Sequence, residues 1–172
     1  IWDVSCQRQV EITGPDASKL VQLMTPRDLR KAQFGQGLYI PLIDDAAGML
    51  NDPVLQKLDN DRFWLSIADS DILLWAKGLA YGMRLKVQIE EPDVSPLAVQ
   101  GPKAIALMAD LMGHKIHDLP YFGFAMFDIL GTRQLIARSG YSKQGGFEIY
   151  LQGGHLGTAL WDMIWEEGQK YN

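Results

Sequence analysis

This sequence of 172 residues has a single cysteine, no excess of positive charge and no long apolar run. Cys6 is the one cysteine, so no internal disulfide can form, and a single thiol is typical of a reducing compartment. The formal net charge of −5 provides no basic surface of the kind that binds nucleic acid. No apolar run approaches the roughly 20 residues that cross a bilayer. We therefore expect a cytoplasmic protein with neither nucleic-acid nor membrane partners.

Several catalytic motifs are missing as well. Neither residues 35–37 nor residues 145–146 have the glycine spacing or the Lys-Ser/Thr ending of a phosphate-binding loop, and no Gly-x-Ser-x-Gly elbow of a hydrolase occurs. His114 and His117 lie three residues apart beside Asp118, but on a short segment. We interpret that segment as a solvated loop, so no metal site is expected.

The composition is that of a globular domain, with 47% apolar and 22% charged residues. The length suits one compact domain, with room for two lobes and a proper core. The chain opens on Ile1 and closes on a polar stretch that reads as the end of a helix. We therefore expect residues 1–172 to be a fragment of a longer protein.

Hydrophobic periodicity predicts strands and helices in mixed order. The expected strands cover residues 8–13, 38–43, 53–58, 62–67, 85–89, 97–99, 124–129, 134–137 and 147–151, and the expected helices cover residues 17–24, 71–81, 104–111 and 157–167. Asp16 is a candidate cap for the first helix, and Asp69 or Ser70 for the second. Strand, Gly-Pro turn and helix recur at residues 10–24 and 97–111, which favours an α+β fold with antiparallel or mixed sheets flanked by helices.

Two carboxylates stand out as candidate binding groups. Asp52 sits between apolar residues at the start of a strand, where we expect a half-buried carboxylate that needs a donor or a cation. The alternative is that Asp52 caps a turn or the start of the strand. Glu148 alternates with Phe147 and Ile149 after a long polar turn, and a carboxylate in that position can accept two N–H bonds from a planar heterocycle. The alternative is an outward-facing strand residue.

Aromatic residues near turns form a third candidate group. Tyr39, Tyr121, Phe122 and Tyr141 could enclose a ring, or present their π-faces to a methylated cation. For any one of them taken alone, the alternative is ordinary core or rim packing.

Four motifs occur in order along nearly the whole chain: Asp-Val-Ser at residues 3–5, the turn Ala-Gly-Met-Leu-Asn-Asp at residues 47–52, Gln-Gly-Pro at residues 100–102, and an Arg-to-Glu signature at residues 138–148. Together they resemble the glycine-cleavage T-protein (aminomethyltransferase) family of folate-binding proteins. That resemblance implies an aminomethyltransferase-type folate-binding domain over residues 1–172, with a ferredoxin-like element in its α+β fold.

The departures from the T-protein pattern point to one branch of the family. Asn51 replaces the first Asp of a pair, residues 142–145 replace Thr-Gly-Glu-Asp, and residues 67–70 replace Asn-Ala-Ala-Asn. In these variants the chain looks like the dimethylsulfoniopropionate demethylases.

The resemblance also implies a tetrahydrofolate site. Asp52 matches the family's essential Asp near the reactive folate nitrogens, and Glu148 matches the Glu that holds the pterin edge. The remaining positions that match the lining of the pterin pocket are Tyr39, Val54, Tyr121 and Tyr141. Gln56 stands where the T-protein pattern has Tyr, so that contact is not carried over.

The function expected from this resemblance is methyl transfer from a sulfonium donor, dimethylsulfoniopropionate, to N-5 of tetrahydrofolate, with Asp52 as the catalytic residue. One alternative is a true aminomethyltransferase of the glycine cleavage system, which would need a lipoyl-carrier protein as partner. A second alternative is a folate-binding module without catalytic activity. A homodimer is left open as the oligomeric state.

Overall fold

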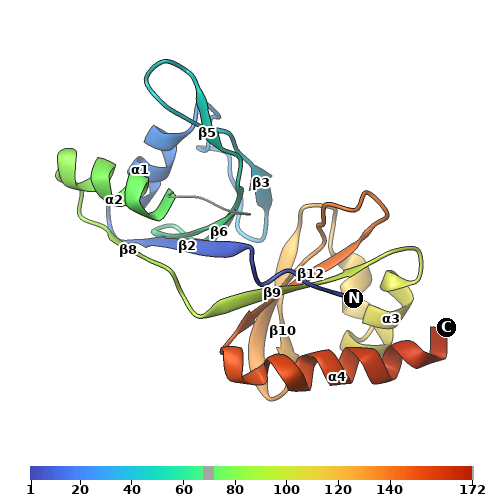
Figure 1. Ribbon diagram of the computed structural model, residues 1–172. Coiled ribbons are helices and arrows are strands. Elements are labelled where there is room, and N and C mark those ends of the chain that lie inside the picture. The colour runs from blue at the N-terminus through green and yellow to red at the C-terminus, as the bar shows by residue number, and fades with distance from the viewer. Residues whose placement is uncertain (68–71, 172) are drawn as a thin grey trace. The chain divides into compact units, whose positions relative to one another are not determined.

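The computed structural model describes residues 1–67 and 72–171, which form two compact units. Gln7–Pro92 make up the first, called here the N-terminal unit. Ile1–Cys6 join the chain from Asp93 onward in the second, called the C-terminal unit. Figure 1 shows that each unit combines a sheet with helices.

The N-terminal unit is built on a five-stranded antiparallel sheet in the order β3-β6-β7-β2-β8. Its strands and helices, with a small β4-β5 ladder, are β2 (Arg8–Thr13), α1 (Ala17–Met24), β3 (Gly37–Tyr39), β4 (Leu42–Ile43), β5 (Met49–Asn51), β6 (Val54–Asp59), β7 (Arg62–Ile67), α2 (Ile72–Gly82) and β8 (Gln88–Glu90). The order β6-β7-β2-β8, with α1 after β2 and α2 after β7, is a ferredoxin-like arrangement.

One face of this sheet forms the core with α1 and α2 (Figure 1). Alternate strand residues such as Val10, Ile12, Leu55 and Leu65 point into it and are fully buried. Gln9 and Glu11 of β2 and Gln56 of β6 alternate with these core residues and therefore project from the opposite face.

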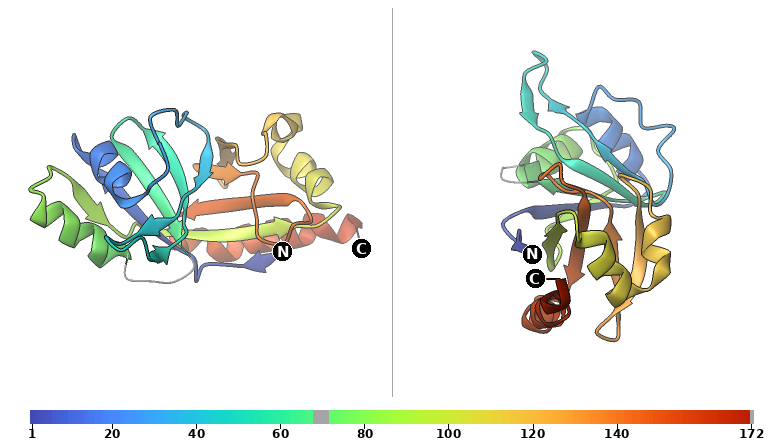
Figure 2. Two further views of the ribbon diagram at one scale, coloured as in Figure 1. Left: turned by 90° about the horizontal axis from the view of Figure 1, so that it is seen from above. Right: turned by 90° about the vertical axis from the view of Figure 1, so that its right-hand side faces the viewer.

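The C-terminal unit is built on a second antiparallel sheet, in the order β1-β9-β12-β11-β10. Its elements are β1 (Trp2–Asp3), β9 (Val94–Gln100), α3 (Ala104–Met112), the 3₁₀ turn η1 (His114–Asp118), β10 (Phe124–Ile129), β11 (Thr132–Ala137), β12 (Gly146–Gln152), η2 (Gly154–Leu156), α4 (Gly157–Gly168) and η3 (Gln169–Tyr171). The long helix α4 runs along β9 in the left view of Figure 2, and its residues Leu160 and Ile164 pack into one core with residues of β9 and β12.

Helices α3 and α4 share one apolar core with the sheet of the C-terminal unit. Val99, Ile136 and Ile149 come from three strands, and Met108 and Leu160 come from the two helices. In β12 the core residues Phe147, Ile149 and Leu151 alternate with Glu148 and Tyr150, which therefore project from the other face.

The α+β prediction is confirmed, and so are the four expected helices within one or two residues at their ends. The hairpin predicted around residues 59–61 is also confirmed by the pairing of β6 with β7. Among the described residues, none of the helices has the length and apolar character to span a bilayer.

Three local expectations were wrong. The run 38–43 is two strands, because Pro41 lacks the N–H that a ladder needs and β3 and β4 pair with different partners. The run 85–89 becomes a strand only at Gln88, since the Leu85 N–H still bonds to Ala80 at the end of α2. Asp16 does not cap α1 with its side chain.

The carboxylate of Asp16 instead accepts a bond of 2.8 Å from the backbone N–H of Lys86. This contact ties the start of α1 to the segment that leads into β8. The caps expected at Asp69 or Ser70 for α2 lie outside the described residues.

Candidate functional site

Asp52 lies between β5 and β6 at the exposed surface of the N-terminal unit, and its carboxylate is oriented by Tyr39. The Tyr39 hydroxyl donates to Oδ2 of Asp52 at 2.7 Å. The expectation that Asp52 would be half-buried was wrong, because the residue is exposed. It nevertheless has the donor that the sequence argument required. Among the described residues, nothing bonds to its Oδ1, which is available to a ligand.

Tyr39 is fixed through its backbone as well as through its hydroxyl. Its carbonyl accepts a bond of 2.6 Å from Nη1 of Arg27, and its backbone is opposite Val54 in the β3-β6 ladder. The hydrogen bond to the Asp52 carboxylate, with smaller contributions from burial and from the negative charge of Asp52, raises the pKa of Tyr39. The phenol is therefore a stable donor at neutral pH. The structure thus brings Tyr39, Asp52 and Val54 together, and their contact with a ligand stays a prediction.

The sheet face that carries Val54 also carries Gln9, Glu11 and Gln56, whose burial was not predicted from the sequence. Gln56 and Gln9 are each only 1% exposed. Within the described part of the chain, neither amide atom of Gln56 has a hydrogen-bond partner, and Oε1 of Gln9 has none either. Glu11 is satisfied, since it accepts bonds of 2.6 Å from Arg62 and 2.8 Å from the indole of Trp64. Polar residues alternating with apolar ones along β2 were the available signal.

Glu148 is the second candidate carboxylate, and it is 8% exposed on β12 of the C-terminal unit. Ser139 donates a short hydrogen bond to its Oε2, and the Tyr150 hydroxyl lies 3.5 Å from the same oxygen. Its neighbours across the sheet are Ala98 and Ala137, which have small apolar side chains. Burial raises the pKa of Glu148, and the bonds from Ser139 and Tyr150 partly oppose that rise.

The loop before β12 is fastened to the end of β9 by Gln100. Its Nε2 donates to the carbonyl of Ser139 at 2.9 Å and to that of Phe147 at 3.2 Å. Its Oε1 accepts a bond of 2.7 Å from the hydroxyl of Ser142. The Gln100 side chain therefore binds the loop at Ser139, Ser142 and Phe147. This fixes Ser139, the loop residue that contacts Glu148.

Tyr121 and Tyr141 belong to the same unit but are open to solvent, with exposed fractions of 69% and 94%. Tyr121 packs edge-to-face on Phe122, with ring centroids 4.8 Å apart. The Phe122 N–H donates to the carbonyl of Arg138 at 2.9 Å, so the segment of Tyr121 is bound to the start of the loop that carries Tyr141. Neither tyrosine has a described hydrogen bond through its hydroxyl, and their contact with a ligand stays a prediction.

The six predicted site residues therefore form two groups. Tyr39, Asp52 and Val54 are in the N-terminal unit, whereas Tyr121, Tyr141 and Glu148 are in the C-terminal unit. That both groups act on one folate molecule stays a prediction.

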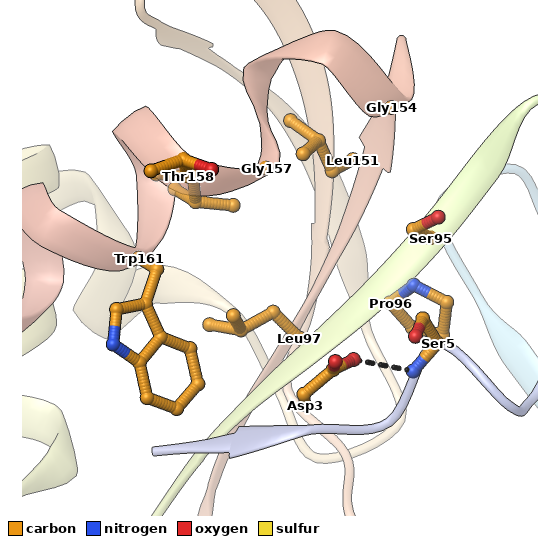
Figure 3. A pocket seen from close by; sticks show the side chains of 11 residues that line it. Asp3, Ser5, Ser95, Pro96, Leu97, Leu151, Gly154, Gly157, Thr158 and Trp161 are labelled. Atoms are coloured by element: carbon orange, nitrogen blue, oxygen red, sulfur yellow. Dashed lines mark hydrogen bonds between the residues drawn. The ribbon is translucent and has the colours of Figure 1, made fainter.

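A cavity of about 520 Å³ lies elsewhere in the C-terminal unit, at the start of α4 (Figure 3). Asp3, Ser95, Thr158 and Trp161 are among its lining residues, and none of the predicted site residues is. The bond from Ser5 to Oδ1 of Asp3, drawn in Figure 3, is 2.9 Å long, and the side-chain and backbone groups of Ser5 lower the pKa of Asp3. The cavity was not predicted from the sequence, although Asp3 and Ser5 belong to the Asp-Val-Ser motif at residues 3–5.

The His114–His117 segment forms the 3₁₀ turn η1, in which the two rings stack with centroids 5.9 Å apart. In the described ranges, no group of three or more His, Cys, Asp or Glu residues has the arrangement needed to hold a metal ion.

The chain belongs to the family whose model is described as the GCVT N-terminal domain, because that model matches residues 1–172. The T-protein resemblance carried by the four motifs is thereby confirmed. Dimethylsulfoniopropionate demethylase DmdA of Ruegeria pomeroyi is 48% identical over 172 residues, which cover 100% of this chain and 47% of the relative. An aminomethyltransferase of Natranaerobius thermophilus is 29% identical over 174 residues, which cover 98% of this chain and 47% of that protein.

The chain thus spans about half the length of the curated relatives it matches. Among solved structures, aminomethyltransferase T of the glycine cleavage system from Bartonella henselae matches with a TM-score of 0.81 and 28% identity, covering 94% of this chain and 44% of that one. Heterotetrameric sarcosine oxidase from Corynebacterium matches with a TM-score of 0.69 and 17% identity, covering 98% and 83%, which shows a shared fold alone.

Proposed function

We propose that the protein containing this chain transfers a methyl group from a sulfonium donor, dimethylsulfoniopropionate, to N-5 of tetrahydrofolate. The exposed Asp52 carboxylate, oriented by Tyr39 through one oxygen and free at the other, is the observation that carries the proposal. In the reaction the bond between sulfur and the methyl carbon breaks, and its electron pair stays on sulfur. A bond from N-5 to that carbon forms, the N-5 proton is lost, and the products are 5-methyltetrahydrofolate and a thioether acid.

This chemistry asks little of the protein beyond positioning. A sulfonium is already a good leaving group, so neither a strong acid nor a metal is required by the step. Holding two reactants in line can supply several kcal/mol, up to ~7–11 kcal/mol in ideal systems. Asp52 would orient the folate and offset the positive charge that develops on N-5 as it is alkylated. Tyr39, Tyr121 or Tyr141 could face the sulfonium, each contact contributing on the order of 1 kcal/mol.

Glu148 suits the pterin edge of the folate. That edge presents N–H donors in a plane, and a carboxylate accepts such donors well. One oxygen of the carboxyl group has no hydrogen bond to the described residues, and the residues opposite Glu148 on the neighbouring strands, Ala98 and Ala137, are small and apolar. Val54, Tyr121 and Tyr141 are the proposed lining of the pterin pocket.

The relatives support the methyl-transfer reaction over its nearest alternative. The demethylase of Ruegeria pomeroyi is 48% identical to the chain, whereas the aminomethyltransferase quoted above is 29% identical. Asn51 and residues 142–145 depart from the T-protein pattern in the same direction. The proposal places the protein in one-carbon metabolism in the cytoplasm, and a homodimer is compatible with it.

One experiment separates the candidate functions. The intact protein is incubated with tetrahydrofolate and dimethylsulfoniopropionate, and the folate product is identified by its mass. A 5-methyltetrahydrofolate product supports the proposal. Formation of 5,10-methylenetetrahydrofolate from an aminomethyl group on a lipoyl-carrier protein would instead identify an aminomethyltransferase. Folate binding with no turnover of any methyl donor would identify a binding module.

A further inference from the structure

The carboxyl group of Glu148 is held asymmetrically. Both described donors, the hydroxyls of Ser139 and Tyr150, approach Oε2, and the Ser139 bond is the shorter of the two. Oε1 has no partner among residues 1–67 and 72–171. The side chains opposite Glu148 on the neighbouring strands are those of Ala98 and Ala137, which carry no polar group. One oxygen is therefore engaged by Ser139 and Tyr150, and the other has no hydrogen bond to the described residues.

Ser139 lies in the loop before β12 and is held in place by the side chain of Gln100. Ser139 is 6% exposed, and its backbone carbonyl accepts a hydrogen bond from the side chain of Gln100. The same Gln100 amide also donates to the carbonyl of Phe147, the residue just before Glu148. The loop position of Ser139 and the strand position of Glu148 are thus set by one amide group. This restricts the carboxyl group to one orientation before any ligand arrives.

We propose that Ser139 is a positioning residue, whose hydroxyl occupies Oε2 of Glu148 and thereby presents Oε1 to the N–H donors of the pterin. This inference rests on the folate site proposed above and names the residue that prepares it. A hydroxyl bond to a carboxylate also favours the ionised form of that carboxylate, which is the form that accepts N–H bonds. Ser139 therefore controls both the direction and the charge of the group that binds.

The direction of the pH effect follows from this arrangement. Burial raises the pKa of Glu148, and the bond from Ser139 is the largest effect opposing the rise. Within the C-terminal unit, Tyr150 is the other titratable side chain that contacts the carboxyl group. Folate binding should weaken as pH falls through the pKa of Glu148. Loss of the Ser139 hydroxyl should move that transition to higher pH.

The test measures the dissociation constant of tetrahydrofolate from pH 4 to pH 8 for the intact protein and its variants. Ser139→Ala is expected to move the midpoint of the transition to higher pH and to weaken binding by about tenfold below neutral pH. Ser139→Thr, which keeps a hydroxyl, should restore the wild-type midpoint. Ser95→Ala is the matched control, because Ser95 is opposite Leu151 on the helix-covered face of the same sheet.

A second measurement does not depend on folate. The carboxyl carbon of Glu148 can be titrated by NMR in the free protein, where Ser139→Ala should raise its pKa and Ser139→Thr should not. An unchanged titration in Ser139→Ala, or a wild-type binding profile in that variant, would overturn the positioning role. If wild-type protein does not bind folate, or Glu148→Gln binds it as well as wild type, the proposed folate site itself is wrong. The NMR titration still decides the role of Ser139 in that case.

Discussion

The Tyr39 hydroxyl donates to Oδ2 of Asp52 at 2.7 Å, although the two residues are 13 positions apart. Tyr39 is the last residue of β3, and Asp52 lies between β5 and β6. The contact is possible because β3 pairs with β6 and so brings the end of β3 beside the segment before Val54. Both partners are exposed, so the bond does not serve to satisfy buried groups. Its consequence is an oriented carboxylate at the surface, which is what an approaching ligand would meet.

The first prediction concerns Asp52 itself. Asp52→Asn keeps the size of the side chain and removes its charge. If the carboxylate offsets charge on N-5 in the transition state, turnover should fall by on the order of 10²–10³. The dissociation constant of tetrahydrofolate should change far less. Steady-state kinetics and equilibrium binding on the intact protein measure the two quantities.

Asp59→Asn provides the control for Asp52→Asn, since Asp59 is an exposed residue at the other end of β6 and should tolerate the change. Equal losses in turnover and in folate binding for Asp52→Asn would mean that Asp52 contributes to binding alone.

The second prediction concerns the hydrogen bond between the two residues. Because the Asp52 carboxylate raises the pKa of Tyr39, the phenol should keep its proton at pH values where an ordinary tyrosine, with a pKa of about 10, has lost it. In Asp52→Asn the pKa should move back toward the ordinary value. The difference in phenolate absorbance between wild type and variant, followed from pH 8 to pH 12, measures the shift. Tyr39→Phe must abolish this difference, and identical titrations in wild type and Asp52→Asn would contradict the assignment.

Much of the fold could be predicted because its signals are local. The hairpin of β6 and β7 follows from two β-rich runs around a turn, and α1 follows from its apolar spacing. The interruption between β3 and β4 at Pro41 could also have been predicted, because proline has no N–H to donate to a neighbouring strand.

The contacts that give the candidate site its geometry could not be predicted in the same way. The bond between Ser139 and Glu148 depends on how a loop returns to its strand, and the bond between Tyr39 and Asp52 depends on the pairing of β3 with β6. The exposure of Asp52 was misjudged because Leu50, Pro53 and Val54 close to it in the sequence are apolar, whereas exposure is set by the position of the turn in three dimensions. Resemblance to a family supplied these residues, but not their hydrogen-bond partners.

The third prediction concerns stability and pH. Glu148 has a raised pKa in the folded protein because it is buried, so its contribution to stability is fully present below its unfolded pKa and is lost as pH rises through the folded pKa. Glu148→Gln removes this dependence. The free energy of unfolding of the variant relative to wild type should therefore increase from acid to neutral pH.

Urea denaturation at several pH values tests this trend for Glu148, with Glu166→Gln on the exposed side of α4 as the control. A relative stability of Glu148→Gln that decreases toward neutral pH would show that the ionised form is the one favoured by folding.

The last prediction tests whether Gln100 and Gly140 fit each other as closely as the structure indicates. Gly140 has a φ of +141°, and a Cβ there would lie 2.2–2.4 Å from the amide atoms of Gln100. Gly140→Ala should cost on the order of 1–3 kcal/mol of unfolding free energy, since it combines backbone strain with this clash. Gly145→Ala is the matched control from the same loop, because its φ is also positive, at +78°, but a Cβ would meet nothing within 4 Å.

A double-mutant cycle separates the two causes of the Gly140→Ala effect. In a Gln100→Ala background the clash is relieved, so Gly140→Ala should cost less than it does in wild type, and the two changes should not be additive. Additive costs would show that a side chain at position 140 does not meet Gln100. In that case the Gln100 amide would not lie against Gly140, and its bonds to the carbonyls of Ser139 and Phe147 would not form as the structure has them.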